Sequence, residues 1–276
     1  MREFFGFGGY QREAEGAFSW QHLTFVTMLM IIMTCLAIWL GRKYRNSDDK
    51  AKNRVLIWAA ILIDGLELFK IVLSCVEDRD PLGWIYVLPL FLCSIQLITI
   101  PLAAFSSGRI KEASLDFISI FGLLGAVLGT YLATQNYNAY PVLSFTNVVS
   151  GITHSISGFA ALYIMIVGMA SMKPKNTWIS CSILSGFGIC AYIVNRIFEA
   201  KTGDSPNYMF LMGGDGTPYD IIYNLVDGNR VIYPLTVMLL FFIYIFVFSR
   251  VYLWAVNRKN RTEAGKESPK PEKVAV

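Results

Sequence analysis

Residues 84–105 read WIYVLPLFLCSIQLITIPLAAF. The stretch is long enough to cross a bilayer as a helix, but it contains Pro89, Cys93, Gln96 and Pro101 where a simple membrane anchor would have Leu or Val. Inside hydrocarbon, polar side chains and the backbone carbonyls freed by proline must be satisfied by neighbouring helices or by water. The stretch therefore predicts an interrupted helix beside a protein-lined cavity, with Cys93 at the centre of that cavity.

Composition places the whole chain in a membrane. Of its 276 residues, 54% are hydrophobic and only 16% are charged, and the mean hydropathy is +0.47. Apolar runs of about 18 to 25 residues suit a hydrocarbon core about 30 Å thick, and they lie at residues 23–41, 55–75, 84–104, 115–134, 145–170, 177–197 and 231–256. We therefore predict an all-α polytopic membrane protein in which residues 1–256 form a single bundle of seven transmembrane helices.

The distribution of basic residues sets the predicted orientation. Lys and Arg gather in segments on one side of the predicted bundle, at residues 42–54, 105–114, 171–177 and after 257. Because cytoplasmic loops are enriched in basic residues, we expect the N-terminus outside, the C-terminus inside, and residues 257–276 as a disordered basic cytoplasmic tail. The net charge of +4 then follows from topology and indicates no nucleic-acid partner. The protein is expected in the cell membrane as a multi-pass protein.

The five cysteines lie in or at the edges of the apolar runs. They show no CxxC and no other paired spacing, so they predict neither a disulfide framework nor a zinc site. We accordingly expect no metal ion and no cofactor.

The second apolar run carries three charges, Asp64, Glu67 and Lys70. Their spacing of three residues places the side chains on overlapping faces of one helix. Charges at that depth cost roughly 2.5–3.5 kcal/mol each on insertion, so they should pair or face a wet interior. Two interpretations stay open: a structural Glu67–Lys70 ion pair, or a group that binds substrate or orients a histidine.

The fifth run, FTNVVSGITHSISGFAALYIM from residue 145, contains a polar stripe with Asn147, Ser150 and His154. Residues three or four apart share one face of a helix, so this face should point into the bundle. A lone intramembrane histidine usually packs through a hydrogen bond. Depth favours a second interpretation, because Cys93 and His154 each lie about nine residues, or roughly 14 Å, from the outer end of their runs.

Glu67 is predicted at a similar depth to Cys93 and His154. The chain's other histidine, His22, opens the first run at the outer surface, where it could be solvated, hydrogen-bonded or part of a site mouth. In the fourth run, Gly125 and Gly129 have the GxxxG spacing that lets helices approach closely. We interpret these glycines as helix-packing residues.

The outer ends of the last two runs carry further polar residues. Asn195 and Arg196 lie near the end of the sixth run, where Arg196 could meet an anionic headgroup or pair with Glu199. The long loop that follows contains an aromatic and apolar insert that begins at Asn207 and Tyr208. This insert predicts a re-entrant or lid-like segment over the cavity.

The sequence resembles the YwaF family of bacterial integral membrane proteins in four segments that occur in the same order: LPLFLC, FGLLGAVLGTYL, THSISG and NYMFL. The resemblance covers about residues 15–255, and the family is related to an animal phospholipid acyltransferase, transmembrane protein 164. It implies that the cysteine of the PLxLC motif, here Cys93, is an acyl-carrying nucleophile and that His154 is its base. This chain has Phe91 where the family commonly has histidine, and whether that difference abolishes activity stays open.

A Cys–His pair at one depth suits acyl chemistry, because a buried thiol needs a neighbouring base to become a thiolate. We therefore predict a lipid acyltransferase or lipid-ester hydrolase with membrane phospholipids as substrates. The competing hypothesis is a transporter or lipid-binding protein, since intramembrane charges and broken helices are typical of these as well. Under the enzymatic hypothesis, the residues expected to bind or orient the substrate are Asp64, Glu67, Gln96, Asn147, Ser150, Asn195, Arg196, Asn207 and Tyr208.

Overall fold

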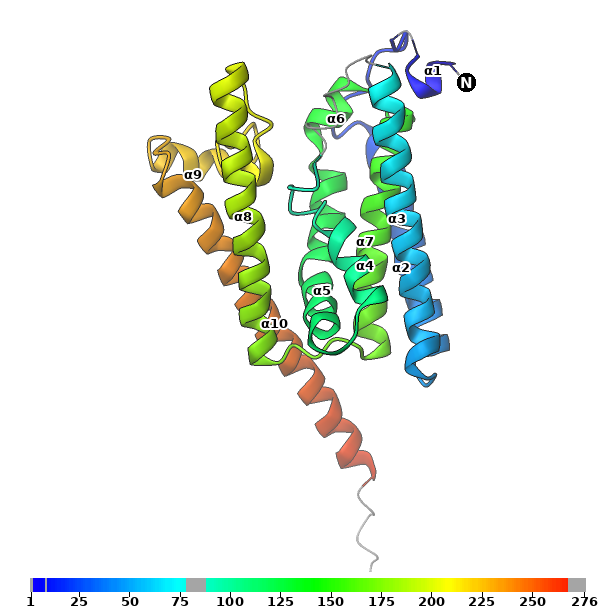
Figure 1. The fold of residues 1–276 in the computed structure, drawn as a ribbon. Helices are drawn as coiled ribbons and strands as arrows, with labels where there is room; N and C mark the ends of the chain where they lie inside the picture. Colours follow the sequence, from blue (N-terminus) through cyan, green and yellow to red (C-terminus); the bar gives the residue numbers. More distant parts are fainter. Residues whose placement is uncertain (1, 8, 78–87, 268–276) are drawn as a thin grey trace, which may run out of the picture.

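The computed structural model describes residues 2–7, 9–77 and 88–267, and the regular structure in these ranges is helical (Figure 1). The elements in chain order are α1 (Arg2–Phe5), α2 (Trp20–Tyr44), α3 (Asp49–Glu77), α4 (Gln96–Phe105), α5 (Gly108–Tyr131), α6 (Thr134–Ala139), α7 (Phe145–Val167), α8 (Pro174–Thr202), the 3-10 helix η2 (Tyr208–Phe210), α9 (Tyr219–Leu225) and α10 (Ile232–Glu267).

Five helical segments in the described part of the chain are long and apolar enough to cross a membrane. They are α2, α5 continued by α6, α7, α8 and α10. α3 has 29 residues, about 44 Å at 1.5 Å per residue, but Asp64, Glu67 and Lys70 interrupt its apolar stretch. The prediction of an all-α membrane protein is confirmed, and five of the seven predicted spans are continuous apolar helices.

The third predicted run, 84–104, is not one continuous helix. Its first residues, 84–87, lie outside the described residues, residues 88–95 form turns, and α4 begins only at Gln96. Within the turns, Leu90 N–H donates to Leu88 O at 2.7 Å, and Ile95 N–H donates to Phe91 O at 3.1 Å. The cause is Pro89, which has no N–H to continue a helix. Cys93 therefore lies on a turn and not on a helix face.

α5 lies at the centre of the larger group of helices, where it packs against α7 and α4. Gly122 allows the close approach to α7, because a Cβ there would lie 2.8 Å from the backbone oxygen of Ser157. α2 packs on α7, and α3 packs on α4 and α7. The core shared by α3, α4, α5 and α7 includes the fully buried Ile100, Ile118 and Tyr163.

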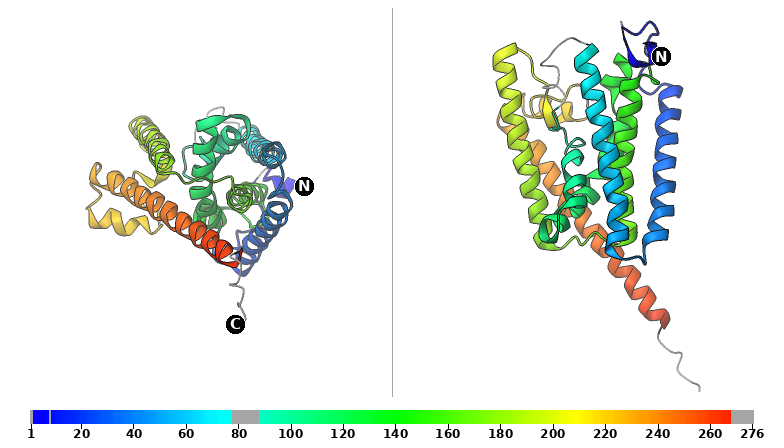
Figure 2. Two further views of the ribbon diagram at one scale, coloured as in Figure 1. Left: turned by 90° about the horizontal axis from the view of Figure 1, so that it is seen from below. Right: turned by 45° about the vertical axis from the view of Figure 1, so that its right-hand side comes forward.

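α8 and α10 form a pair that leans beside this group and meets it mainly through α5 (Figures 1 and 2). Phe121 of α5, Tyr233 and Val237 belong to the core at this junction. The chain between α8 and α10 carries η2 and α9. α10 continues to Glu267, so residues 257–267 extend the helix where the sequence predicted a disordered tail, and residues 268–276 lie outside the described residues.

The outer surface of the helices suits a lipid environment. Met28, Trp58, Ile189 and Leu235 are each more than half exposed, and they lie on α2, α3, α8 and α10. Large apolar side chains exposed on so many helices contact lipid when the protein is in a membrane. The loops between α2 and α3, α4 and α5, and α7 and α8 lie at the same end of the molecule as the carboxyl end of α10 (Figure 1).

Candidate active site

The turn at residues 88–95 holds Cys93 against the middle of α5. A Cβ built on Gly125 would lie 3.5 Å from both Cα and Cβ of Cys93, so the turn packs directly on the helix at that glycine. The sulfur lies 4.0 Å from the hydroxyl oxygen of Ser94. Because this segment is not helical, it can bring Cys93 close to α5.

His154 projects from α7 toward the same helix. The Cδ2 and Nε2 atoms of its ring occupy the space where a Cβ of residue 129 would be, so the ring fits only because that residue is glycine. Its Nδ1 lies 2.7 Å from the backbone oxygen of Ser150 and 3.5 Å from the hydroxyl of the same residue. A carbonyl oxygen can only accept, so Nδ1 carries the proton and Nε2 has the free lone pair.

The structure brings the Cys93 thiol and the His154 imidazole together. The two groups act on each other electrostatically, although buried Nε2 makes no hydrogen bond within the described residues. Such loose geometry is common in enzymes without substrate. Cys93 lies against Gly125 and the His154 ring against Gly129, and these glycines are one helical turn apart on α5. The spacing of this GxxxG pair predicts a helix-packing motif. In the structure, both candidate catalytic residues pack against it.

Two of the three charged side chains of α3 form an ion pair with each other, and the third is not part of that pair. Glu67 and Lys70 form an ion pair at 2.5 Å, and their side chains are 14% and 15% exposed. Lys70 acts electrostatically on His154, so the charge of this pair reaches the imidazole. Glu67 does not orient the histidine, because Ser150 accepts the Nδ1 proton. Asp64 has a buried carboxylate oxygen, Oδ1, without a partner in the described part of the chain.

The second histidine shows what a packing histidine looks like in this protein. His22 is fully buried and lies 3.8 Å, centroid to centroid, from the ring of Tyr137. Its Nδ1 accepts from Phe18 N–H at 3.0 Å, and its Nε2 donates to Thr130 O at 3.0 Å. Both nitrogens are used, so His22 does not line a site mouth. His154 differs because one nitrogen is left for chemistry.

Asn147 serves the fold instead of the site. Its side-chain Nδ2 donates to the backbone oxygens of Asn136, Tyr140 and Pro141, at 3.4, 3.1 and 3.0 Å. These bonds hold the connection between α6 and α7. The polar stripe predicted on α7 therefore contains both a structural residue and the candidate base.

The amides near the carboxyl end of α8 also organise a loop. Asn195 accepts from Tyr208 N–H at 2.8 Å and donates to Tyr208 O at 3.0 Å. Asn207 donates to Gly213 O at 2.8 Å and accepts from Met212 N–H at 2.8 Å. Arg196 pairs with Glu199 at 2.5 Å. These three predicted site residues stand with the α8 loop and are not brought to Cys93.

Tyr208 links that loop to the Cys93 turn. Its hydroxyl accepts from Leu88 N–H at 3.1 Å, and burial raises its pKa to about 12, so it stays protonated. Phe91 packs against Tyr208 and Phe210, with ring centroids 5.0 and 6.0 Å apart. Phe91 is at the position where the resemblance predicts histidine. Its aromatic contacts thus join the turn to the loop.

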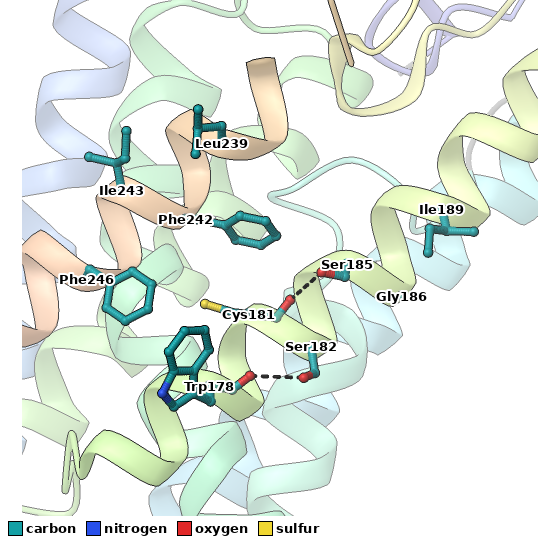
Figure 3. A pocket seen from close by; sticks show the side chains of 10 residues that line it. All are labelled: Trp178, Cys181, Ser182, Ser185, Gly186, Ile189, Leu239, Phe242, Ile243 and Phe246. Carbon is teal, nitrogen blue, oxygen red and sulfur yellow. Dashed lines mark hydrogen bonds between the residues drawn. The ribbon is translucent and has the colours of Figure 1, made fainter. Parts of the chain in front are cut away.

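A groove of about 710 Å³ lies between α8 and α10 (Figure 3). Its lining includes Trp178, Phe242 and Phe246, together with Cys181, but neither Cys93 nor His154. The two serine hydroxyls in the groove donate to backbone oxygens of their own helix. The groove offers an apolar surface to lipid and no reactive pair.

Gln96 completes the polar set near Cys93. It is fully buried at the start of α4, and its Oε1 accepts from Thr99 Oγ1 at 3.0 Å. Among the described residues, no group of three or more His, Cys, Asp or Glu side chains could hold a metal ion.

Comparison with known proteins gives one clear relationship. No curated protein and no solved structure gives a significant match to the chain. The model of the TMEM164 family matches residues 17–254, a range that includes Cys93, His154, the glycines of α5 and the α8 loop. A match over that share of the sequence shows that this protein belongs to the TMEM164 family.

Proposed function

We propose that this protein is a membrane-embedded lipid acyltransferase or lipid-ester hydrolase that forms a thioester on Cys93. The observation that carries the proposal is that Cys93 and the imidazole of His154 lie against glycines one turn apart on α5, with Nδ1 of the imidazole fixed by Ser150. A histidine held in one tautomer beside a thiol is the arrangement that nucleophilic catalysis requires. The resemblance of the LPLFLC and THSISG segments supports the same two residues.

In the proposed reaction, His154 Nε2 removes the thiol proton, and the sulfur attacks the carbonyl carbon of a lipid ester. The carbonyl electrons move to oxygen, and their return expels the alkoxide of the lysolipid. The imidazolium then protonates that alkoxide. A second alcohol or amine releases the acyl group in a transferase, and water does so in a hydrolase. Cys93 is restored in either case.

The surroundings of Cys93 suit a lipid substrate. The site lies among helices whose outer surfaces carry large apolar side chains, so an acyl chain reaches it from the bilayer without entering water. We propose the phospholipids of the cell membrane as the source of the ester. Phe91 lies in the aromatic contact with Tyr208, and in the proposed mechanism it stabilises the turn while His154 alone moves the proton.

An acylation experiment tests the proposal. Protein in membranes is treated with an alkyne-tagged fatty acyl p-nitrophenyl ester, and the hydroxylamine-sensitive label on each cysteine is measured by mass spectrometry over time. Cys93 should be acylated first, although Cys35 and Cys190 are more exposed, because thiolate character and not exposure controls the reaction. Cys93→Ser should remove this label, and His154→Ala should slow it by about 10²–10⁴-fold.

The opposite order of labelling would reject the proposal. If the exposed cysteines react before Cys93, and His154→Ala leaves the Cys93 rate unchanged, the thiol is a packing residue. A lipid-binding or transport role would then be the better hypothesis. Each variant is compared with wild type for its elution in size-exclusion chromatography, so that a loss of folding is recognised.

We further propose that the chain crosses the membrane seven times with its N-terminus outside. α3 and the segment that contains α4 complete the five apolar spans, and the basic loops all lie at one end (Figure 1). A charged maleimide that cannot cross the membrane should therefore label Lys201→Cys in intact cells and miss Asn46→Cys, since both positions are exposed. Wild-type protein gives the background, and the reverse pattern would overturn the orientation.

A further inference from the structure

Gln96 has a side-chain amide with one end fixed and the other unpaired. The residue is fully buried, Oε1 accepts from Thr99 Oγ1 at 3.0 Å, and Nε2 has no hydrogen-bond partner within the described residues. Leaving a buried N–H unpaired costs free energy, and hydrocarbon offers no water to reduce that cost. An amide kept in this state is preorganised to donate to something that the protein binds.

The backbone places this donor beside Cys93. Gln96 N–H donates to Cys93 O at 3.3 Å, so Gln96 opens α4 at the end of the turn that carries Cys93. In the described part of the chain, the N–H groups of Cys93 and Ser94 donate to no backbone oxygen. The partial positive charge at the start of α4 adds to these donors. Several hydrogen-bond donors thus lie within three residues of the thiol.

We propose that Gln96 Nε2 binds the oxyanion that forms when Cys93 attacks the carbonyl of a carboxylic ester. This inference rests on the proposed function and assigns the one group that the Cys–His pair lacks. As the C–S bond forms, the π electrons of the carbonyl move to oxygen, and Nε2–H donates to that oxygen. When the C=O bond is restored, the C–O bond to the lysolipid breaks, and the proton held by His154 passes to the leaving oxygen. Gln96 neither gains nor loses a proton.

Two electrophiles distinguish this role from simple packing. An acyl p-nitrophenyl ester reacts through a tetrahedral oxyanion, whereas a long-chain iodoacetamide alkylates the same thiol by direct displacement at carbon and forms no oxyanion. Gln96→Met removes the donor with little change in volume. It should slow acylation of Cys93 by about 10²–10³-fold, the effect of a lost oxyanion donor, and leave alkylation of Cys93 within about 2-fold of wild type.

Thr99→Val is the second variant, because it keeps the amide but removes the hydroxyl that holds its oxygen. It should slow acylation by a smaller factor than Gln96→Met and leave alkylation unchanged. If both variants acylate Cys93 at the wild-type rate, or if acylation and alkylation fall by the same factor in both, Gln96 is a structural residue and the inference is wrong. Failure of the proposed function looks different, because wild-type Cys93 itself would then fail to be acylated before the other cysteines.

Discussion

Gly129→Ala is expected to slow acylation of Cys93 by about 10²–10⁴-fold, the contribution of a positioned general base, although residue 129 carries no reactive group. The Cδ2–Nε2 edge of the His154 ring occupies the place of the added methyl group. The ring is held on its other side by the 2.7 Å bond from Nδ1 to Ser150 O. It cannot stay where it is when the methyl group is added, so Nε2 must turn away from the thiol.

Gly125→Ala is the matched control for this prediction. It lies one turn away on the same helix, and its added Cβ would be 3.5 Å from Cys93, an ordinary contact. Alanine is also favoured over glycine inside a helix by roughly 0.5–1 kcal/mol. This variant should therefore keep acylation near the wild-type rate. Equal losses in Gly125→Ala and Gly129→Ala would mean that both glycines act only by packing helices.

A double-mutant cycle separates displacement of the ring from general damage. In a His154→Ala background the ring is absent, so adding Gly129→Ala should cause no further loss of acylation. Gly129→Ala alone should lower the thermal stability, because overpacking a core costs about 1–3 kcal/mol. The double variant should regain that stability, because the ring that overlaps with the added methyl group is absent. A further loss of either quantity in the double variant would contradict the proposed displacement.

Much of this site could be predicted from local pattern. Hydropathy and helix length located the continuous spans, and Pro89 predicted the break before α4 because proline ends a helix wherever it lacks a bonded N–H. Counting residues at a helical rise predicted one level for Cys93 and His154, and both lie against α5, although the count assumed a helix where Cys93 lies on a turn. These inferences need only a few neighbouring residues, so they survive without knowledge of the tertiary structure.

Other roles depend on contacts that sequence spacing does not contain. The side-chain amide of Asn195 has the hydrogen-bonding groups of a substrate-binding residue. In the structure, however, it bonds to the backbone of Tyr208, 13 residues away in the sequence. Gly125 and Gly129 have the spacing of a helix dimerisation motif, yet the His154 ring of α7 occupies the space beside Gly129 and the Cys93 turn lies against Gly125. A glycine pair shows where something approaches closely, and only the fold shows what approaches.

The same limit applies to Asp116, a buried residue of α5 for which the sequence suggested no role. Its carboxylate accepts four hydrogen bonds from the connection to α8: from Ser171 N–H at 2.7 Å and its hydroxyl at 2.9 Å, from Met172 N–H at 3.0 Å, and from Asn176 Nδ2 at 2.9 Å. All of these donors are at least 55 residues away in the chain. The carboxylate joins the α8–α10 pair to the larger group of helices.

Asp116→Ala is accordingly expected to lower the free energy of unfolding by about 3–5 kcal/mol, because several buried donors lose their acceptor at once. Met172 has a φ of 47°, a strained conformation for a side chain with Cβ, and the bond to Asp116 holds it there, so the connection should also change conformation when this acceptor is lost. Denaturant unfolding in detergent micelles measures the loss. Trypsin cleavage after Lys175, in the first turn of α8, should accelerate in parallel.

Glu112→Ala provides the comparison, because Glu112 lies one turn earlier on α5 and also joins this connection. Its bond to Lys173 is 3.2 Å long, but the two side chains are 45% and 60% exposed, so its loss should change stability by less than about 1 kcal/mol. Asp116 lies near the amino end of α5, away from Gly125 and Gly129 where the Cys93 turn and His154 dock. Acylation of the folded Asp116→Ala fraction should therefore proceed at the wild-type rate. If its unfolding energy matches that of Glu112→Ala, the four bonds do not hold α8 in place.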